Sequence, residues 1–442
     1  MGKLPYIPHT ESDVSEMLAR VGVSGVEDLF SDVPKKFIKK GAYALPDAMS
    51  EQQVLEWFEG LAGMNPRMTV FAGAGAYDHY TPSVIPYITS RSEFLTAYTP
   101  YQSEISQGTL RYIFEFQSMI CALTGLDVSN ASLYDGPTAA AEAMMMCVAS
   151  TRKKNRVLLS STLFPHVLKV VRTYARFHGI ETSLVEAKDG ETSLESLRSL
   201  LAAGDVAGVI LPQLNRYGII EDHTGFADEI HAAKALMVHY SDPSALALLK
   251  TPAEWGADIS VGDGQPLGIP LCFGGPYVGF MAVKQELMRK MPGRIVGQTV
   301  DKDGKRCFVL TLQAREQHIR RDKATSNICS NESLMALWVT VYLSLMGPEG
   351  LKQVNRLSSD GAHYLYDSLM ATGQFEEVFP GKPFLKEFVL KPKIFPGLIQ
   401  RSLEKAGFFG ALDTEEGYVS FCVTEKRTKE EIDRLVAAIK EG

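Results

Sequence analysis

The chain has 442 residues, of which 45% are apolar and 22% are charged, and its formal net charge is −7. This composition is ordinary for a globular protein, and the length leaves room for two or three domains. The acidic balance and the dispersed basic residues give no reason to expect nucleic-acid binding. We also expect no signal peptide and no membrane span, because residues 1–10 lack the required pattern and no stretch of about 20 apolar residues occurs.

The cysteines give no sign of a metal site. No two of them form a C-x-x-C pair, and no Cys/His cluster has metal-ligand spacing. We therefore expect no bound metal, and reduced, mostly buried thiols in a cytoplasmic protein. The six are Cys121, Cys147, Cys272, Cys307, Cys329 and Cys422.

Residues 1–65 predict an N-terminal arm of short helices. Thr10 is a good N-cap for a helix over residues 11–21, and Ser24 and Ser50 are candidate caps of two further helices.

Residues 66–325 predict a large α/β domain. Apolar strands at 156–160, 182–185, 207–211, 236–240, 259–262 and 277–283 are separated by helices at 164–177, 193–203 and 226–235. Continuous apolar strands that alternate with helices indicate a mainly parallel sheet covered on both faces.

Residues 326–442 have a different pattern, which predicts a smaller C-terminal α+β domain. Long helices are expected at 331–345 and 350–370, strands at 384–390 and 418–423, and a closing helix at 429–439.

The segment 98–108, YTPYQSEISQG, is the first candidate for a site. An amphipathic helix follows it at once, with Leu110, Ile113 and Phe116 at helical spacing. Pro100 favours an extended backbone before it, which suits the presentation of Tyr98, Tyr101, Gln102 and Gln107 to a pocket. A polar surface loop is the alternative interpretation.

The segment 131–142 predicts a turn that leads into a helix N-terminus. Such an N-terminus can hold an anion with its backbone N–H groups and its dipole. Pro137 lies at or near the first helical position, where it favours the helix but removes one N–H donor. A plain helix start is the simpler interpretation of this segment by itself.

Two polar residues follow predicted strands at the edge where α/β sheets bind ligands. Asn215 could contact a ligand, but it also suits a turn that ends at Gly218. Asp242 stands roughly where a carboxylate could pair with a pyridine nitrogen, although a turn with Pro243 is the simpler role.

A basic run occupies residues 311–330. Arg315, His318 and Arg321 lie close together, and such groups repel one another unless a carboxylate, phosphate or partner surface neutralises them. Thr325, Ser326 and Asn327 follow with hydroxyl and amide groups. The alternative interpretation is a solvated charged face.

Gln265 is the most informative single residue. It lies in the segment 258–276, DISVGDGQPLGIPLCFGGP, in which an apolar strand leads into a tight turn and a Gly-rich return. This pattern resembles the stretch that anchors the cofactor in pyridoxal-phosphate enzymes. An amide cannot form a Schiff base, so we expect no covalent cofactor on this chain.

The whole chain resembles the glycine decarboxylase P-protein family of the glycine cleavage system, in the form of its separate first subunit. The motifs are RSEFLTAYTPYQ (91–102), QGTLRYIFEFQ (107–117), NASLYDG (130–136), GDGQPLG (262–268), PGRIVG (292–297) and REQHIRR (315–321). The resemblance implies the aspartate-aminotransferase-like fold, fold type I of the pyridoxal-phosphate enzymes. It also implies a second subunit that carries the cofactor lysine in a His-Lys-Thr sequence, in an α₂β₂ assembly, and that lysine aligns with Gln265.

The activity that this resemblance implies is that of a glycine dehydrogenase (aminomethyl-transferring). Glycine is decarboxylated on pyridoxal phosphate, CO₂ is released, and the aminomethyl group passes to the lipoyl-lysine of the H-protein. The first subunit would complete the partner's active site. The residues expected to reach it are Tyr98, Tyr101, Gln102, Gln107, Arg315, His318, Arg321, Thr325, Ser326 and Asn327, the last three at its phosphate edge.

Two alternatives stay open. The chain could be a self-sufficient pyridoxal-phosphate enzyme that uses another lysine, such as Lys250 or Lys284. It could also be a non-catalytic scaffold that only stabilises the cofactor-bearing partner or docks the H-protein.

Overall fold

The computed structural model describes residues 6–151, 153–313, 317–324 and 326–441. The chain divides into two compact units, Met1–Pro66 and Arg67–Gly442. Each is described by itself below.

The first unit consists of short helices without a core. Its helices are α1 (Glu11–Val21) and α2 (Glu51–Gly63), with two 3₁₀ helices at Val26–Phe30 and Lys35–Phe37. Thr10 and Ser50 cap α1 and α2 as predicted, each in a capping box. Ser24 does not cap a helix; its hydroxyl donates to Asp28 instead. None of the described residues of this unit is buried.

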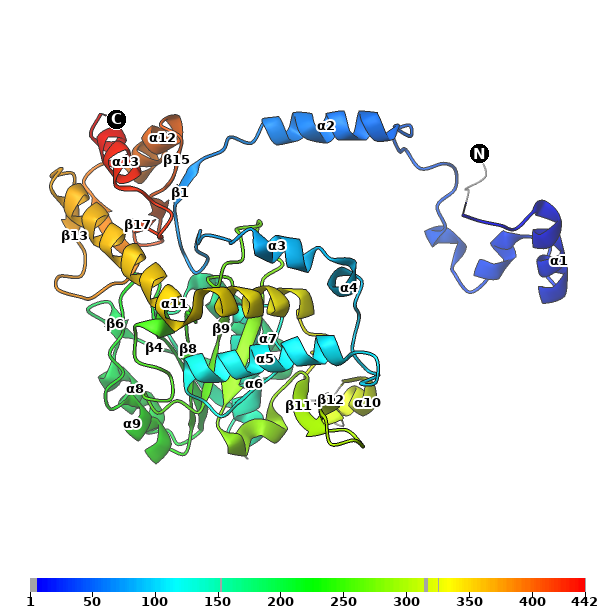
Figure 1. The fold of residues 1–442 in the computed structure, drawn as a ribbon, viewed down its shortest axis with the longest axis horizontal. Helices are drawn as coiled ribbons and strands as arrows, with labels where there is room; N and C mark the ends of the chain where they lie inside the picture. The colour runs from blue at the N-terminus through cyan, green and yellow to red at the C-terminus, as the bar shows by residue number, and fades with distance from the viewer. Residues whose placement is uncertain (1–5, 152, 314–316, 325, 442) are drawn as a thin grey trace. The chain divides into compact units, whose positions relative to one another are not determined.

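The second unit contains the remaining elements (Figure 1). Its helices are α3 (Val84–Thr89), α4 (Ser92–Leu95), α5 (Gln107–Thr124), α6 (Gly136–Ser150), α7 (Pro165–His178), α8 (Leu194–Leu201), α9 (Phe226–Ala232), α10 (Gln317–Arg320), α11 (Ser333–Met370), α12 (Pro396–Lys405) and α13 (Lys429–Glu441). Its strands are β1 (Thr69–Phe71), β2 (Val128–Ser129), β3 (Arg156–Ser160), β4 (Glu181–Val185), β5 (Ala187–Lys188), β6 (Glu191–Thr192), β7 (Val206–Pro212), β8 (Leu236–Tyr240), β9 (Ile259–Asp263), β10 (Gly279–Val283), β11 (Ile295–Val300), β12 (Arg306–Thr311), β13 (Phe375–Glu377), β14 (Glu387–Pro392), β15 (Phe408–Gly410), β16 (Leu412–Asp413) and β17 (Val419–Cys422).

A seven-stranded sheet with the order β2-β10-β9-β8-β7-β3-β4 forms the centre of this unit. The strands from β9 to β4 pair in parallel, and only β10 runs against its neighbours. Both faces are covered: Val157 and Leu159 pack among α6 and α7, whereas Leu158 packs among α8 and α9. The predicted α/β class with a mainly parallel sheet is confirmed.

A second layer contains the antiparallel sheet β13-β14-β17-β16. Strand β1 pairs in parallel with β15, so residues from the start of this unit pack with residues near its end. This layer lies at the upper left of the second unit in Figure 1, and its core includes residues of α11, α12 and α13.

Helix α11 covers both of the long helices expected in the tail, and it is bent between them. Gly347 has φ 59° and ψ −178°, which is not helical, and Pro348 follows. Among the described helices, α11 alone has the length and apolarity of a membrane span, with 33% of that window buried. The backbone break at Gly347 divides the segment, so its two halves do not form one straight span.

All six cysteines are free, but fewer are buried than predicted. Cys147 and Cys422 are buried, Cys272 is exposed, and the other three are half-buried. The expectation of mostly buried thiols is therefore wrong. Within the described residues, no group of three or more His, Cys, Asp or Glu side chains is placed to hold a metal ion.

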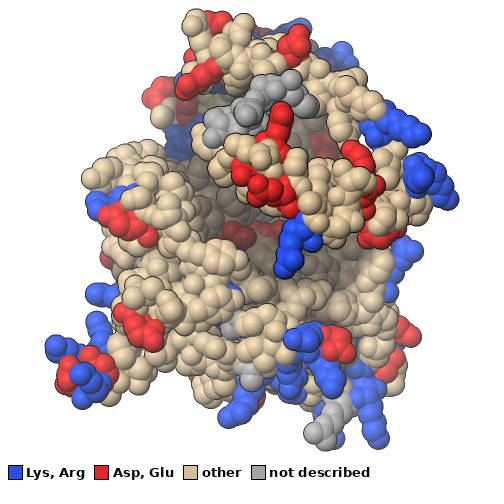
Figure 2. Space-filling model, turned by 90° about the vertical axis from the view of Figure 1, so that its right-hand side faces the viewer, with Lys and Arg blue, Asp and Glu red and all other residues tan. Residues whose placement is uncertain are grey.

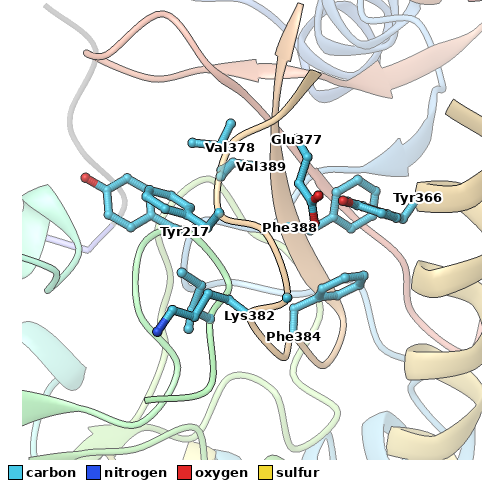
Figure 3. Close-up of a pocket in the computed structure, with 11 residues that line it drawn as sticks. Tyr217, Tyr366, Glu377, Val378, Lys382, Phe384, Phe388 and Val389 are labelled. Atoms are coloured by element: carbon cyan, nitrogen blue, oxygen red, sulfur yellow. The ribbon is translucent and has the colours of Figure 1, made fainter. Parts of the chain in front are cut away.

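The loop after β7 joins the two layers. Ile220 N–H donates to the carbonyl of Pro383 over 2.9 Å, and Ile219 bridges to Phe384. Figure 3 shows the cavity beside this junction, which is lined by Tyr217 of the loop and by Phe384 and Phe388. Its volume is about 100 Å³.

We predict that Gly218→Ala destabilises the protein far more than Gly204→Ala. Both glycines have positive φ, 83° and 75°, so each alanine carries backbone strain of about 1–2 kcal/mol. At Gly218 a Cβ would also lie 1.9 Å from the carbonyl oxygen of Glu387, whereas nothing lies within 4 Å at Gly204. Equal losses in urea unfolding would contradict this account of the junction.

Candidate functional site

Gln265 is fully buried, and its side-chain amide is fully used. Its Nε2 donates to the carbonyls of Tyr77 (2.7 Å) and Ile269 (2.8 Å), and its Oε1 accepts from Tyr77 N–H (2.7 Å). A lysine could replace the two donated bonds but has no acceptor for the N–H of Tyr77. The amide of Gln265 therefore stabilises the local fold through its three hydrogen bonds.

The N-terminus of α6 is occupied by carboxyl groups of this chain. Asp263 accepts from the N–H of Gly136 (2.9 Å) and from the N–H of Gln265 (2.9 Å). Asp135 caps the helix by accepting from Thr138 N–H over 2.7 Å, and Pro137 lies in the first turn as predicted. Burial raises the pKa of Asp263 to about 7, and bonds from Gly136 and Gln265 partly offset it. Carboxyl groups of this chain therefore occupy the N–H groups that were predicted to bind an anion.

Asp242 follows β8 and pairs with a buried lysine. Its Oδ2 lies 2.6 Å from Nζ of Lys386, and its Oδ1 accepts from Ser244 N–H over 2.9 Å. The predicted turn role is therefore present, and the other oxygen forms an ion pair. The Lys386 side chain is fully buried and Asp242 is 7% exposed.

These groups surround a very small cavity. Its volume is about 20 Å³, and Tyr77, Tyr240, Asp242 and Asp263 are among its lining residues. This space holds about one water molecule. The pocket does not fit pyridoxal phosphate. The amide of Gln265 is fully hydrogen-bonded, carboxyl groups occupy the N-terminus of α6, and Asp242 is paired with Lys386.

Neither alternative lysine lies in this pocket. Lys284 pairs with Asp258 at 2.6 Å, and Lys250 lies over the ring of Trp255 at 3.7 Å. These contacts give no support to a self-sufficient enzyme that uses Lys250 or Lys284.

Asn215 has the turn role. Its side-chain nitrogen donates to the carbonyl of Gly190 and to Glu221, and its oxygen accepts from the N–H of Tyr217. The side chain is buried, so its hydrogen bonds stabilise the junction loop.

The predicted segment at 98–107 lies over a buried arginine. Tyr98 is 81% exposed, Tyr101 is 51% exposed and Gln102 is exposed. Arg294 is buried; its guanidinium donates to Tyr101 Oη and to Thr99 Oγ1, both over 3.3 Å. It also lies 5.3 Å from the centre of the Tyr101 ring. Arg294 was within a family motif but was not singled out from the sequence.

Among the described residues, His318 of the basic segment contacts Tyr101 of the first segment. The rings of His318 and Tyr101 pack edge to face with centres 5.9 Å apart. Arg321 is exposed and has φ 54°. Arg315 and Thr325 lie outside the described residues. On the face shown in Figure 2, basic side chains lie among acidic ones.

The polar residues that follow the basic run are engaged within the chain. Ser326 Oγ accepts from Ile328 N–H over 3.0 Å, and Asn327 Oδ1 accepts from Gln317 Nε2 over 3.3 Å. Ser326 also bonds to Glu142. Asn327 is exposed, so of the two it has the side chain nearer to solvent.

Gln107 holds a hairpin that the sequence did not reveal. Its amide exchanges two bonds of 2.9 Å with the backbone of Phe308 in β12. Gln117, three turns along α5, does the same with Val296 in β11. These bonds fix the β11–β12 hairpin on α5, and Arg294 immediately precedes β11.

Glu142 is a buried acid that was not predicted from the sequence. It lies in α6 within a run of alanines and methionines, and it is 3% exposed. Burial raises its pKa to about 7, and the bond from Ser326 opposes that rise. A single charge within an apolar helix was the available signal.

Comparisons with known proteins agree over the full length. The family model described as glycine cleavage system P-protein matches residues 5–439. The probable glycine dehydrogenase (decarboxylating) subunit 1 of Moorella thermoacetica is 51% identical over 443 residues, which cover 99% of each chain. That of Desulforamulus reducens is 49% identical over 445 residues, again with 99% of each covered.

Comparison with solved structures also identifies a P-protein that matches over the full length. A crystal structure of glycine decarboxylase (P-protein) of the glycine cleavage system, in inhibitor-bound form, has a TM-score of 0.90 and 42% identity. It covers 99% of this chain and 100% of that one. Sphingosine-1-phosphate lyase of Burkholderia pseudomallei has a TM-score of 0.67 with 12% identity, covering 91% and 92%, which shows the fold alone. The predicted fold type I is confirmed.

We predict that Glu142→Gln stabilises the protein at pH 8 and leaves it unchanged near pH 4. The acid has a raised pKa in the folded state, so the folded protein binds more protons than the unfolded chain between about pH 4.5 and 7. Stability therefore falls as the pH rises through this range, by about 3 kcal/mol. Parallel Tm–pH curves for variant and wild type would contradict the assignment, and the exposed Glu349→Gln serves as the control.

Proposed function

Because this chain belongs to the glycine cleavage system P-protein family, we propose that it is the first subunit of a glycine dehydrogenase (decarboxylating) and completes the active site of a second subunit. The complex decarboxylates glycine, releases CO₂ and passes the aminomethyl group to the lipoyl-lysine of the H-protein. In this proposal the second subunit carries pyridoxal phosphate on its lysine, and the assembly is α₂β₂ and cytoplasmic. Pyridoxal phosphate supplies the electron sink for loss of the carboxylate.

The observation that carries the proposal is a contrast between two regions of one chain. The pocket beside Gln265 has about 20 Å³ of space, whereas Tyr98 and Tyr101 are exposed and a buried arginine donates a hydrogen bond to Tyr101. A tyrosine that is exposed yet held by a buried arginine suits an interface, because its ring is oriented before the partner arrives.

Arg294 supplies that orientation. The planar guanidinium donates to Tyr101 and Thr99 at once, so it fixes the segment at two points. His318 packs against the same ring from the basic segment. Tyr98, Tyr101, Gln102 and His318 are therefore the residues that we expect to face the partner's glycine and cofactor.

A scaffold role without contact to the reacting groups is the second candidate. It is favoured by the bonds of Gln107 to β12 and of Ser326 to Glu142 and Ile328, since these groups are used inside the chain. The two candidates differ in what they predict for Tyr101.

We predict that Tyr101→Ala lowers glycine–bicarbonate exchange at least tenfold in the complex reconstituted with the second subunit and the H-protein. The matched control is Phe177→Ala, which removes an exposed ring of α7 and leaves the rate unchanged. Wild-type rates in Tyr101→Ala and in Tyr98→Ala would favour the scaffold.

We predict that Arg294→Lys impairs exchange because an ammonium cannot hold Tyr101 and Thr99 with one planar fork. The expected effect is a lower kcat with subunit assembly intact, checked by size-exclusion chromatography. Full activity in Arg294→Lys, with loss only in Arg294→Met, would mean that charge alone suffices.

The placement of the cofactor has a direct test. Borohydride reduction of the two-subunit complex, followed by peptide mapping, should yield pyridoxyl-lysine on the second subunit. A pyridoxyl-lysine on this chain would overturn the proposed division of roles.

A further inference from the structure

The loop that follows the Gln265 turn exposes a large aromatic ring. Phe273 is fully exposed, and its neighbours Leu271 and Cys272 are exposed as well. The backbone of Phe273 has φ 50°, a left-handed conformation that residues other than glycine rarely adopt. The exposed ring and the strained backbone are both unfavourable in the chain by itself, and backbone strain of this kind is concentrated at binding sites.

A hydrogen-bonded turn fixes the backbone around this ring. The N–H of Gly275 donates to the carbonyl of Cys272 over 3.0 Å. Gly274 and Gly275 have φ 100° and 136°, which glycine reaches without steric cost. Because the ring of Phe273 is fully exposed, its position is set by the backbone of the turn and not by packing of its side chain.

Helix α3 has apolar side chains on opposite faces. Ile85 is buried and packs with Leu267 and Ile269, which precede the loop. Tyr87 of the same helix is exposed. A helix that is apolar on all sides is typically buried on all sides, so the outer face of α3 indicates a surface that a partner covers.

Hydrogen bonds connect the start of α3 to the start of the loop. The hydroxyl of Thr81 donates to the carbonyl of Gly268 over 2.8 Å, and the indole N–H of Trp338 donates to the same carbonyl over 2.7 Å. At its other end, α3 leads through α4 to the segment 98–107. The exposed apolar side chains along this path are called the docking face: Tyr80, Tyr87, Leu95, Tyr98, Leu271 and Phe273.

We propose that the docking face binds the second subunit, and that the ring of Phe273 inserts into a pocket of that subunit. The inference rests on the proposed function, which brings the second subunit to Tyr98 and Tyr101, because Tyr98 belongs to the docking face. A partner at Tyr98 must extend over neighbouring residues, since a stable interface buries about 800 Å² on each side. Large aromatic rings contribute much of the binding energy of such interfaces.

Assembly measurements test the docking face. In Phe273→Ala and in Tyr87→Ala, the Kd of this chain for the second subunit should rise about tenfold or more, because each variant loses an aromatic ring from the interface. The Tm of each free variant should equal that of the free wild-type chain, since both rings are exposed. The matched control is Phe395→Ala, which removes an exposed ring before α12 and should leave the Kd unchanged. A wild-type Kd in Phe273→Ala would overturn the proposal.

The neighbouring thiol gives a second readout. Cys272 is exposed, so a maleimide should label it in the free chain, and this labelling should be lost in the assembled complex. A cysteine introduced on α7 by Phe177→Cys should be labelled equally in both. Equal labelling of Cys272 in the free chain and in the complex would overturn the proposal. Protection of Cys272 in the free chain would also overturn it, because another part of the chain would then cover the face.

These outcomes separate the docking face from the proposed function. Wild-type exchange in Tyr101→Ala, with weakened assembly in Phe273→Ala, would count against the role in the active site and leave the docking face in place. A higher KM for the H-protein in Phe273→Ala, with subunit assembly unchanged, would assign the face to the H-protein and overturn the inference. A dimer of the free chain that Phe273→Ala dissociates would overturn it as well, because the occupant would be a second copy of this chain.

Discussion

The contact between Lys386 and Asp242 joins the two layers of the second unit, and both side chains are buried. A lysine without solvent exposure persists only when a carboxylate lies beside it, so β8, β14 and the loop that carries His79 must hold fixed positions around the pair. The amide of Gln265 adds a second constraint, because it donates a hydrogen bond to the backbone carbonyl of Tyr77.

In other proteins with this fold, polar groups of the pocket contact a bound cofactor. In this chain the corresponding groups bond to one another. Buried donors and acceptors need partners, and the chain supplies them for three groups at this pocket. Asp263 accepts from Gly136 at the N-terminus of α6, Lys386 neutralises Asp242, and Gln265 bonds to the backbone of Tyr77. These bonds within the chain stabilise the pocket, which supports the proposal that the chain contributes to a partner's site through its surface.

The segment 98–107 differs from the pocket, because its tyrosines are exposed and the arginine that holds it is buried. Tyr98 and Tyr101 are exposed, yet Arg294, which contacts Tyr101, is buried and precedes a hairpin that Gln107 and Gln117 hold by hydrogen bonds. Rigid support under exposed aromatic rings lowers the entropic cost of docking. This arrangement favours an interface over a solvated loop.

The sequence by itself determined the class of the fold and the absence of a Schiff-base lysine at Gln265. Continuous apolar strands between helices report burial on both faces, and an amide cannot act as an amine whatever surrounds it, so both conclusions follow from local chemistry. The caps at Thr10 and Ser50 were predictable for the same reason, since a capping box is complete within four residues.

Tertiary structure alone decided the rest. The hairpin β11–β12, the role of Arg294 under Tyr101 and the pairing of Lys386 with Asp242 join residues separated by 6 to 193 positions. No local pattern marks Lys386, which stands in the sequence as one lysine among many. Lys386 becomes a structural constraint only when folding brings it, just before β14, against Asp242, just after β8, because only then is its charge removed from water.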